Sequence, residues 1–167
     1  MKAYKVKLKL NNRQKTECYK IARACHFTYN WCLAKQQENY ENGNKFISDV
    51  DIRREFTKYK QENKWLYDIP NEALKDSIKN CNEAYIRFFK KKSKPPKFKS
   101  KKKSKLSFLQ RHDSGFHIFQ DNRVQLSNIG IVKFYEKDYI PLNEKYLNIH
   151  ITEECGDWYM SLSIDNQ

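Results

Sequence analysis

Lysine is the residue type with the clearest chemical potential in this sequence, and it is concentrated between Lys90 and Lys105. No acidic residue lies between Glu83 and Asp113, whereas that interval holds twelve lysines and arginines. The whole chain has 33 Lys and Arg against 20 Asp and Glu, so 21 basic residues (33 minus 12) remain elsewhere, and the rest is nearly neutral. Because basic side chains that displace counterions from phosphates gain affinity, the tract predicts binding to a polyanion, with nucleic acid as the leading partner.

A lysine run is also typical of a solvated linker, and that alternative stays open here. Two features favour binding. Pro95-Pro96 stiffens the backbone inside the tract. Aromatic residues are interleaved with the charge, and an exposed ring beside lysines can stack on a base. We expect Phe88 and Phe89 to lie in the core, which leaves Phe98 and Phe108 as candidates for stacking.

Other kinds of chemistry find little support. The five cysteines are odd in number and include no Cys-x-x-Cys, which argues against a zinc ribbon or a disulfide framework. The four histidines are scattered, the paired carboxylates lie at expected turns, and the chain has only four glycines. We therefore expect no cofactor, no metal site and no catalytic residue in this chain.

The length of 167 residues suits one domain or two small ones. No apolar run approaches the roughly 20 residues that span a bilayer, and the opening MKAYKVKLKL alternates where a signal peptide would be continuously apolar. We expect a cytoplasmic protein with no membrane partner.

Helical periodicity predicts three helices in the first half, after an alternating strand at residues 3–10. An Asn11/Gln14 capping box begins a helix that reaches about Tyr40, with Gly43 as its left-handed C-terminal cap. Three cysteines spaced by seven residues share its apolar face, which favours buried free thiols. Ser48 is expected to cap a second helix and Asn71 a third. The second is expected to carry Val50, Phe56 and Tyr59, and the third an apolar stripe of Leu74, Ile78, Cys81, Tyr85, Phe88 and Phe89.

After Lys105 the period changes from 3.6 to 2, and six short strands are expected. They are residues 106–110, 116–120, 123–126, 131–135, 146–151 and 158–164. With the first strand they predict an α+β fold: a small oligonucleotide-binding-type β-barrel, interrupted by a helical insertion after its first strand. The expected domains are residues 1–10 with 105–167 (barrel) and residues 11–104 (helices and basic tract).

Four blocks of residues, in order, resemble the N-terminal half of TnpB, an RNA-guided nuclease of bacterial insertion sequences that is related to miniature type V CRISPR effectors. They are Phe27–Leu33 (FTYNWCL), the series Trp65-Leu66, Ala73-Leu74 and Phe88-Phe89, then Pro96–Lys101 (PKFKSK), and last Ile129–Lys133 (IGIVK) with Gly156–Tyr159 (GDWY). The resemblance covers essentially the whole chain. It implies a wedge domain interrupted by a helical recognition lobe.

In that family the two parts hold a guide RNA and its RNA–DNA heteroduplex and read a short motif in duplex DNA, so guide RNA and duplex target DNA are the implied partners. The family continues into a RuvC-like nuclease and a zinc ribbon. Here the sequence given ends at Gln167, and Asp165 lacks the glycine-rich surroundings of the family's first catalytic aspartate. One carboxylate cannot hold two metal ions, so we expect this chain by itself not to be an enzyme.

The candidate contact residues form two sets. Those expected to bind RNA or phosphate are Arg87, Lys97, Phe98, Lys99, Lys101, Lys102, Lys103 and Lys105. Those carried over from the family as readers of the DNA motif are Asp49, Arg53, Asn71, Glu72, Lys75, Leu109 and Gln110. Arginine suits a guanine edge, and asparagine or glutamine an adenine edge. As alternatives, Asn71 is a helix cap and Arg53 belongs to a solvated face.

Two other functions remain open. The chain could be a guide-independent helix-turn-helix DNA-binding accessory protein of transposition, or half of a split nuclease completed by a separate polypeptide. A second copy of the chain is a further candidate partner.

Overall fold

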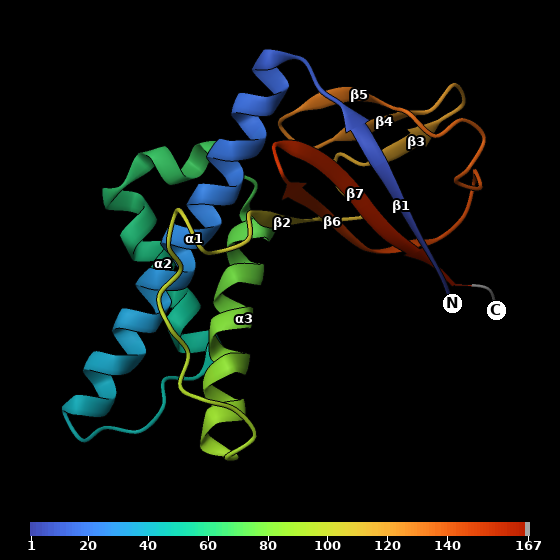
Figure 1. Ribbon diagram of the computed structural model, residues 1–167. Helices are drawn as coiled ribbons and strands as arrows, with labels where there is room; N and C mark the ends of the chain where they lie inside the picture. Colours follow the sequence, from blue (N-terminus) through green and yellow to red (C-terminus); the bar gives the residue numbers. More distant parts are fainter. Residues whose placement is uncertain (166–167) are drawn as a thin grey trace. The chain divides into compact units, whose positions relative to one another are not determined.

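The computed structural model describes residues 1–165, which form two compact units (Figure 1). The sheet unit comprises residues 1–22 and the chain from residue 105 onward, and the helical unit comprises residues 23–104. The helices are α1 (Asn12–Glu41), α2 (Asp49–Glu62), the 3-10 helix η1 (Lys64–Asp68) and α3 (Asn71–Phe89). The strands are β1 (Lys2–Lys9), β2 (Ser107–Gln110), β3 (His117–Phe119), β4 (Arg123–Leu126), β5 (Gly130–Phe134), β6 (Tyr146–Glu154) and β7 (Asp157–Ile164).

The seven strands form one antiparallel sheet in the order β2-β6-β7-β1-β5-β4-β3. The N-terminal strand β1 therefore lies inside the sheet, between β7 and β5 (Figure 1). The predicted α+β class is confirmed, and each predicted strand is found within three residues of its expected ends.

The sheet is open, and this corrects the expectation of a closed barrel. β2 and β3 stand at the two ends of the strand order, and no pairing joins them within residues 1–165. β2 has four residues and β3 has three, so each edge offers few backbone groups for the pairing that closure requires.

Alternation of side chains gives the sheet a buried inner face and an exposed outer face. Along β7, Trp158, Met160, Leu162 and Ile164 are all buried, while the residues between them are half-buried. Phe108 is also buried, at 4% exposure, with its ring 6.3 Å from that of Trp158. The expectation that Phe108 offers an exposed ring for stacking is therefore wrong, because β2 turns it into the core.

The start of α1 is fixed to the sheet by the predicted capping box. Asn11 Oδ1 accepts a hydrogen bond from Gln14 N at 2.8 Å, and Gln14 Oε1 accepts one from Asn11 N at 3.0 Å. The side-chain amide of Gln14 also donates to the carbonyl of Ile131 (2.9 Å), and the guanidinium of Arg13 donates to that of Ile129 (2.8 Å). Both carbonyls flank the start of β5, so the first turn of α1 is positioned by the sheet.

Two more predicted caps bound the helices. Gly43 has φ of +75° after the end of α1, a conformation that a residue with a side chain adopts only with strain. Ser48 accepts a hydrogen bond from Asp51 N at 3.2 Å and begins α2. Ile21, Leu33, Ile52, Leu66, Leu74 and Ile78 are among the fully buried side chains of the helices.

Three expectations about the helices are wrong. Asn71 does not cap α3: it is the first helical residue, after Pro70, and its side-chain oxygen accepts a hydrogen bond from Lys60 Nζ at 2.9 Å. Val50 lies on the exposed side of α2, which buries Ile52 in its place. Phe89 is 45% exposed because the apolar stripe of α3 turns out of the core in its last turn.

The cysteines are free thiols, and Cys18, Cys25, Cys32 and Cys81 are buried while Cys155 is exposed. Burial raises the pKa of Cys18 and of Cys25 to about 12. A hydrogen bond with Cys81, together with burial, also raises the pKa of Cys32. Within residues 1–165, no helix is both long and apolar enough to cross a membrane.

Replacement of Leu74 by Ala should lower the free energy of unfolding by about 2–5 kcal/mol, because a fully buried leucine leaves a cavity. Val50→Ala is the matched control on α2, where a side chain 58% exposed should change it by less than about 0.5 kcal/mol. Urea titration followed by circular dichroism measures both. Equal effects of the two substitutions would contradict the packing described.

Thiol labelling should separate Cys155 from the other cysteines. At pH 8 the raised pKa keeps Cys18 and Cys25 protonated, and burial blocks access, so only Cys155 should react rapidly with an aromatic disulfide reagent. All five should react in denaturant. Cys155→Ser should abolish the rapid phase, and rapid labelling of a second thiol in that variant would contradict the burial.

Candidate nucleic-acid interface

The basic tract begins where α3 ends. Lys91 has φ of +58°, its amide donates to the carbonyl of Phe88 (2.9 Å), and the amide of Lys92 donates to that of Arg87 (2.9 Å). This left-handed turn stops the helix and releases the chain into a segment without helix or strand that continues to residue 106. Every lysine of the tract is exposed.

Asn30 of α1 fixes the middle of the tract. Its side-chain oxygen accepts a hydrogen bond from Lys99 N at 2.7 Å, and its side-chain nitrogen donates to Lys99 O at 3.0 Å. The ammonium group of Lys99 lies 4.7 Å from the centre of the Tyr29 ring. The amide of Asn30 thus acts as a short strand partner for one residue of the tract, which is held against α1.

A tight turn follows directly. Ser104 N donates to Ser100 O (3.1 Å), Ser100 N donates to Ser104 Oγ (2.8 Å), and Lys103 N donates to Ser100 Oγ (3.1 Å). The two serines close a loop whose tip is formed by Lys101, Lys102 and Lys103. The tip therefore presents three ammonium groups from an ordered backbone.

The other predicted phosphate contacts surround this region of the sequence. Arg87 is exposed in the last turn of α3, Lys97 is exposed, and Phe98 is 51% exposed. Burial and the neighbouring Cys81 raise the pKa of Tyr29, while the charge of Arg87 opposes them, so Arg87 and Lys99 both act on the same ring. Lys105 begins the second segment of the sheet unit.

An aromatic cavity of about 240 Å³ adjoins the tract within the helical unit. Its wall includes Tyr40 from α1, Phe88 and Phe89 from α3, and Pro95 from the tract itself. Tyr40 is 67% exposed. The helical spacing of apolar residues places Phe89 in the core, so this cavity was not expected from the sequence. The signal was present in the adjacent pair Phe88-Phe89, since two neighbouring residues of a helix cannot both face the same core direction.

The predicted motif readers of the helical unit form two groups. In the first, Asp49 accepts a hydrogen bond from the amide of Asn82 (3.0 Å) and pairs with Arg53 one turn along α2. In the second, Asn71 accepts from Lys60, and Glu72 pairs with Lys75 at 4.0 Å. Burial lowers the pKa of Lys60, and the charge of Lys75 adds to that effect.

Leu109 and Gln110 lie on β2 in the sheet unit. Gln110 is only 4% exposed, and its side-chain nitrogen donates to the carbonyls of Arg111 and Ser114 and to the hydroxyl of Ser127, at 2.9–3.1 Å. Its side-chain oxygen accepts from Ser127 N at 3.0 Å. The amide of Gln110 is thus fully occupied in holding the loop after β2, and Leu109 beside it is half-buried.

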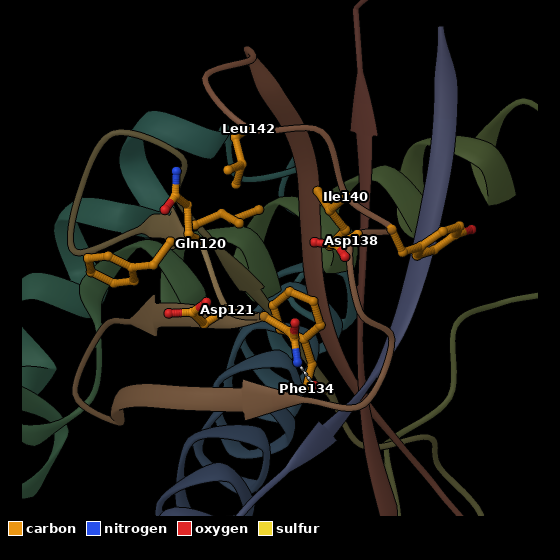
Figure 2. A pocket seen from close by; sticks show the side chains of 10 residues that line it. Gln120, Asp121, Phe134, Asp138, Ile140 and Leu142 are labelled. Atoms are coloured by element: carbon orange, nitrogen blue, oxygen red, sulfur yellow. Dashed lines mark hydrogen bonds between the residues drawn. The ribbon is translucent and has the colours of Figure 1, made fainter.

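The sheet unit contains a small cavity of about 40 Å³ between the β3–β4 turn and the loop after β5 (Figure 2). Figure 2 shows Asp121 and Asp138 approaching it from these two segments, with Phe134, Ile140 and Leu142 around them. Asn122 fixes the turn by donating to the carbonyl of Phe134 at 3.2 Å. The space suits a water molecule and is too small for a nucleobase. Across residues 1–165, no group of three or more His, Cys, Asp or Glu side chains could hold a metal ion.

Comparison with known proteins agrees with the class inferred from the sequence. Residues 1–45 match a family model described as a helix-turn-helix domain of the OrfB IS605 type. Over 170 aligned residues the chain is 30% identical to a protein of Escherichia coli (strain K12) named "Putative RNA-guided DNA endonuclease InsQ". The alignment covers 100% of this chain and 41% of InsQ, so the chain spans less than half of that relative's length. The likeness to TnpB-type proteins is confirmed.

Loss of the Asn30 amide should free the tract from α1. In Asn30→Ala, the amide of Lys99 loses its hydrogen-bond acceptor, so its hydrogen exchange should accelerate at least tenfold. Tryptic cleavage after Lys97 and Lys99 should become faster for the same reason. Asn39→Ala, at an exposed α1 amide bonded to the carbonyl of Lys45, is the matched control and should leave both rates unchanged. Unchanged exchange at Lys99 in Asn30→Ala would show that the clamp does not order the tract.

Proposed function

We propose that this chain is a nucleic-acid-binding module that holds a guide RNA and reads a short motif in duplex DNA beside the target. The main support is a basic tract without acidic residues whose backbone is fixed by Asn30 and by the Ser100–Ser104 turn. Lys101, Lys102 and Lys103 form the tip of that turn. A linker gains nothing from such fixation. A phosphate-binding site does gain, because a backbone that is already fixed loses less conformational entropy when its lysines are ordered on a ligand.

The family resemblance and the identity to InsQ support RNA as the ligand of the tract. In this proposal Lys97, Lys99, Lys101, Lys102, Lys103, Lys105 and Arg87 neutralise backbone phosphates, and the exposed ring of Phe98 stacks on a base. Residues 1–10 and 105–167 form a wedge domain of the oligonucleotide-binding type, and residues 11–104 form the recognition lobe.

Reading of the DNA motif is assigned to the starts of α2 and α3. Arg53 can exchange its partner Asp49 for a guanine edge, and Asn71 can exchange Lys60 for an adenine edge. Glu72 and Lys75, whose charged groups lie 4.0 Å apart, are assigned as further contacts to the DNA. On β2, Gln110 serves by holding the loop beside Leu109, because its own amide is occupied.

The proposal concerns binding and not cleavage. The name of InsQ includes an endonuclease activity, and this chain spans 41% of InsQ, so that activity is not carried over to the chain. DNA cleavage would require a separate nuclease polypeptide that acts together with this chain. Metal-dependent cutting that appears only when such a partner is added would identify it.

A second candidate is guide-independent DNA binding, which the helix-turn-helix description of residues 1–45 favours. Those residues comprise β1, α1 and the turn at Gly43, so the matched segment contains one helix, α1. The next helix, α2, follows a connection of seven residues, Asn42 to Ser48, whereas helix-turn-helix motifs use a turn of about 3–4 residues. This geometry supports the guide-dependent reading over the second candidate.

The function is tested by what the purified protein carries and binds. The protein should copurify with RNA of defined sequence, and binding of duplex DNA should depend on that RNA. Sequence-selective binding of DNA by RNA-free protein would favour the second candidate instead. Absence of both bound RNA and affinity for structured RNA would refute the proposal.

Replacement of Lys101, Lys102 and Lys103 by Gln should lower the slope of log affinity against log salt for a duplex RNA by about 0.9 for each lysine that contacts a phosphate. The control carries Gln at Lys45, Lys58 and Lys64, three exposed lysines of the helical unit outside the tract, with the same loss of charge. Its slope should stay near that of the wild type. Equal losses in the two triple variants would mean that only net charge matters, against a site at the tract.

A further inference from the structure

Three basic side chains stand side by side on the outer face of the sheet. Lys9 of β1 lies directly opposite Lys133 of β5, and Lys133 lies directly opposite Arg123 of β4. The row ends at Phe119 of β3, which is opposite Arg123. Residues directly opposite in neighbouring strands point to the same face, with Cβ atoms about 4.5–5.5 Å apart. We name Lys9, Lys133 and Arg123 the cationic row.

The cationic row has no acidic partner among the described residues, in contrast to Lys5 and Lys7 of β1. Lys5 pairs with Glu154 at 2.8 Å, and Lys7 pairs with Asp157 at 3.4 Å. No carboxylate lies within 4.0 Å of Lys9, Lys133 or Arg123 in residues 1–165. Lys9 and Lys133 are exposed and Arg123 is half-buried.

Folding by itself does not account for this arrangement. Like charges directly opposite in a sheet destabilise it, and here the repulsion occurs twice across three neighbouring strands. A bound anion would convert both repulsions into attractions. Neighbouring strands lie about 4.8 Å apart, so the row extends about 9.6 Å, enough for two consecutive phosphates of one strand.

Aromatic rings beside the row indicate the kind of anion. Tyr135, 54% exposed, lies two residues from Lys133, and the ammonium group of Lys9 is 5.5 Å from its ring centre. The guanidinium of Arg123 lies 5.4 Å from the centre of the Phe119 ring. Phosphate-binding cations interleaved with rings are the pattern of single-stranded nucleic-acid surfaces, where bases stack on the rings.

We propose that the cationic row, with Tyr135 and Phe119 beside it, is a second nucleic-acid site, which binds the backbone of a single-stranded RNA segment. This site lies on the sheet unit and is made of residues other than those of the basic tract. It deepens the proposed function and rests on it, because both require that the chain binds RNA.

The test uses the full chain, a fluorescent oligouridylate as the single-stranded probe, and Lys133→Gln. One lost phosphate contact lowers the salt slope by about 0.7, which corresponds to a roughly fivefold loss of affinity at 0.1 M salt. Lys5→Gln is the matched control, because Lys5 is on the same sheet but is paired with Glu154. It should bind within twofold of the wild type.

Stability separates a binding role from a structural one. Because Lys133→Gln removes two like-charge contacts, its urea midpoint should equal or exceed that of the wild type while its affinity falls. A midpoint that falls in parallel with affinity would overturn the proposal in favour of a structural role. The triple variant with Gln at Lys9, Arg123 and Lys133 should lower the salt slope by about 1.4, the value for two single-strand phosphates.

Tyr135→Leu tests the stacking. It keeps an apolar side chain but removes the ring, so affinity for oligouridylate should fall about fivefold or more, while affinity for a blunt RNA duplex changes less than twofold. Equal losses for the two probes would overturn the assignment to a single strand.

The remaining outcomes separate this inference from the proposed function. One outcome is that Lys133→Gln binds oligouridylate as well as the wild type, while the variant with Gln at Lys101, Lys102 and Lys103 loses binding. That result overturns the proposal for the cationic row and leaves the proposed function intact. Another outcome is that Lys133→Gln loses binding to polyglutamate but keeps binding to oligouridylate. That result overturns the RNA site in favour of an acidic protein partner. A wild-type protein that binds no RNA or DNA overturns both.

Discussion

The pairing of β1 inside the sheet is the constraint on which the sheet unit depends. β1 pairs with β7 from Lys2 to Lys7 and with β5 at Leu8 and Lys9, so within residues 1–165 it is the strand that joins β2-β6-β7 to β5-β4-β3. The first residues of the chain must therefore meet strands more than 120 residues later. The first part of α1 still belongs to the sheet unit, whereas residues 23–104 form a separate unit whose helices have a core of their own.

This constraint also determines where charge is compensated. Where β1 runs beside β7, the hairpin between β6 and β7 supplies Glu154 and Asp157 as partners for Lys5 and Lys7. Where β1 crosses to β5, the neighbouring strands supply Lys133 and Arg123 instead. In the helical unit the same contrast holds: Arg53 and Lys75 have carboxylate partners, whereas the tip of the Ser100–Ser104 turn has three lysines in succession. Neighbouring basic residues without a nearby carboxylate therefore occur on both units, at the cationic row and at the tip of the Ser100–Ser104 turn.

Much of the fold could be predicted because its signals are local. The period-2 pattern gave seven strands, and the capping box at Asn11 and Gln14, the cap at Ser48 and the left-handed Gly43 gave the helix ends. The errors arise where tertiary contacts decide. Asn71 has the right residue type for a cap, but Lys60 from the preceding helix takes its side-chain oxygen. Phe108 lies in an alternating strand whose register with β6, set by Phe108 opposite Ile151, turns it inward.

The site is predictable to a smaller degree, for a physical reason. Composition locates the basic tract, yet only the three-dimensional structure gives the clamp by Asn30, since residue 30 and residue 99 are brought together by the packing of the helical unit. The cationic row is more hidden still, because its members are spread over positions 9, 123 and 133, and sheet register alone makes them neighbours. Each is unremarkable as a single exposed base in the sequence. If the row binds a phosphate chain as proposed, the repulsion that adjacency creates in the free protein is relieved on binding, so stability and affinity are linked by the same electrostatic interaction.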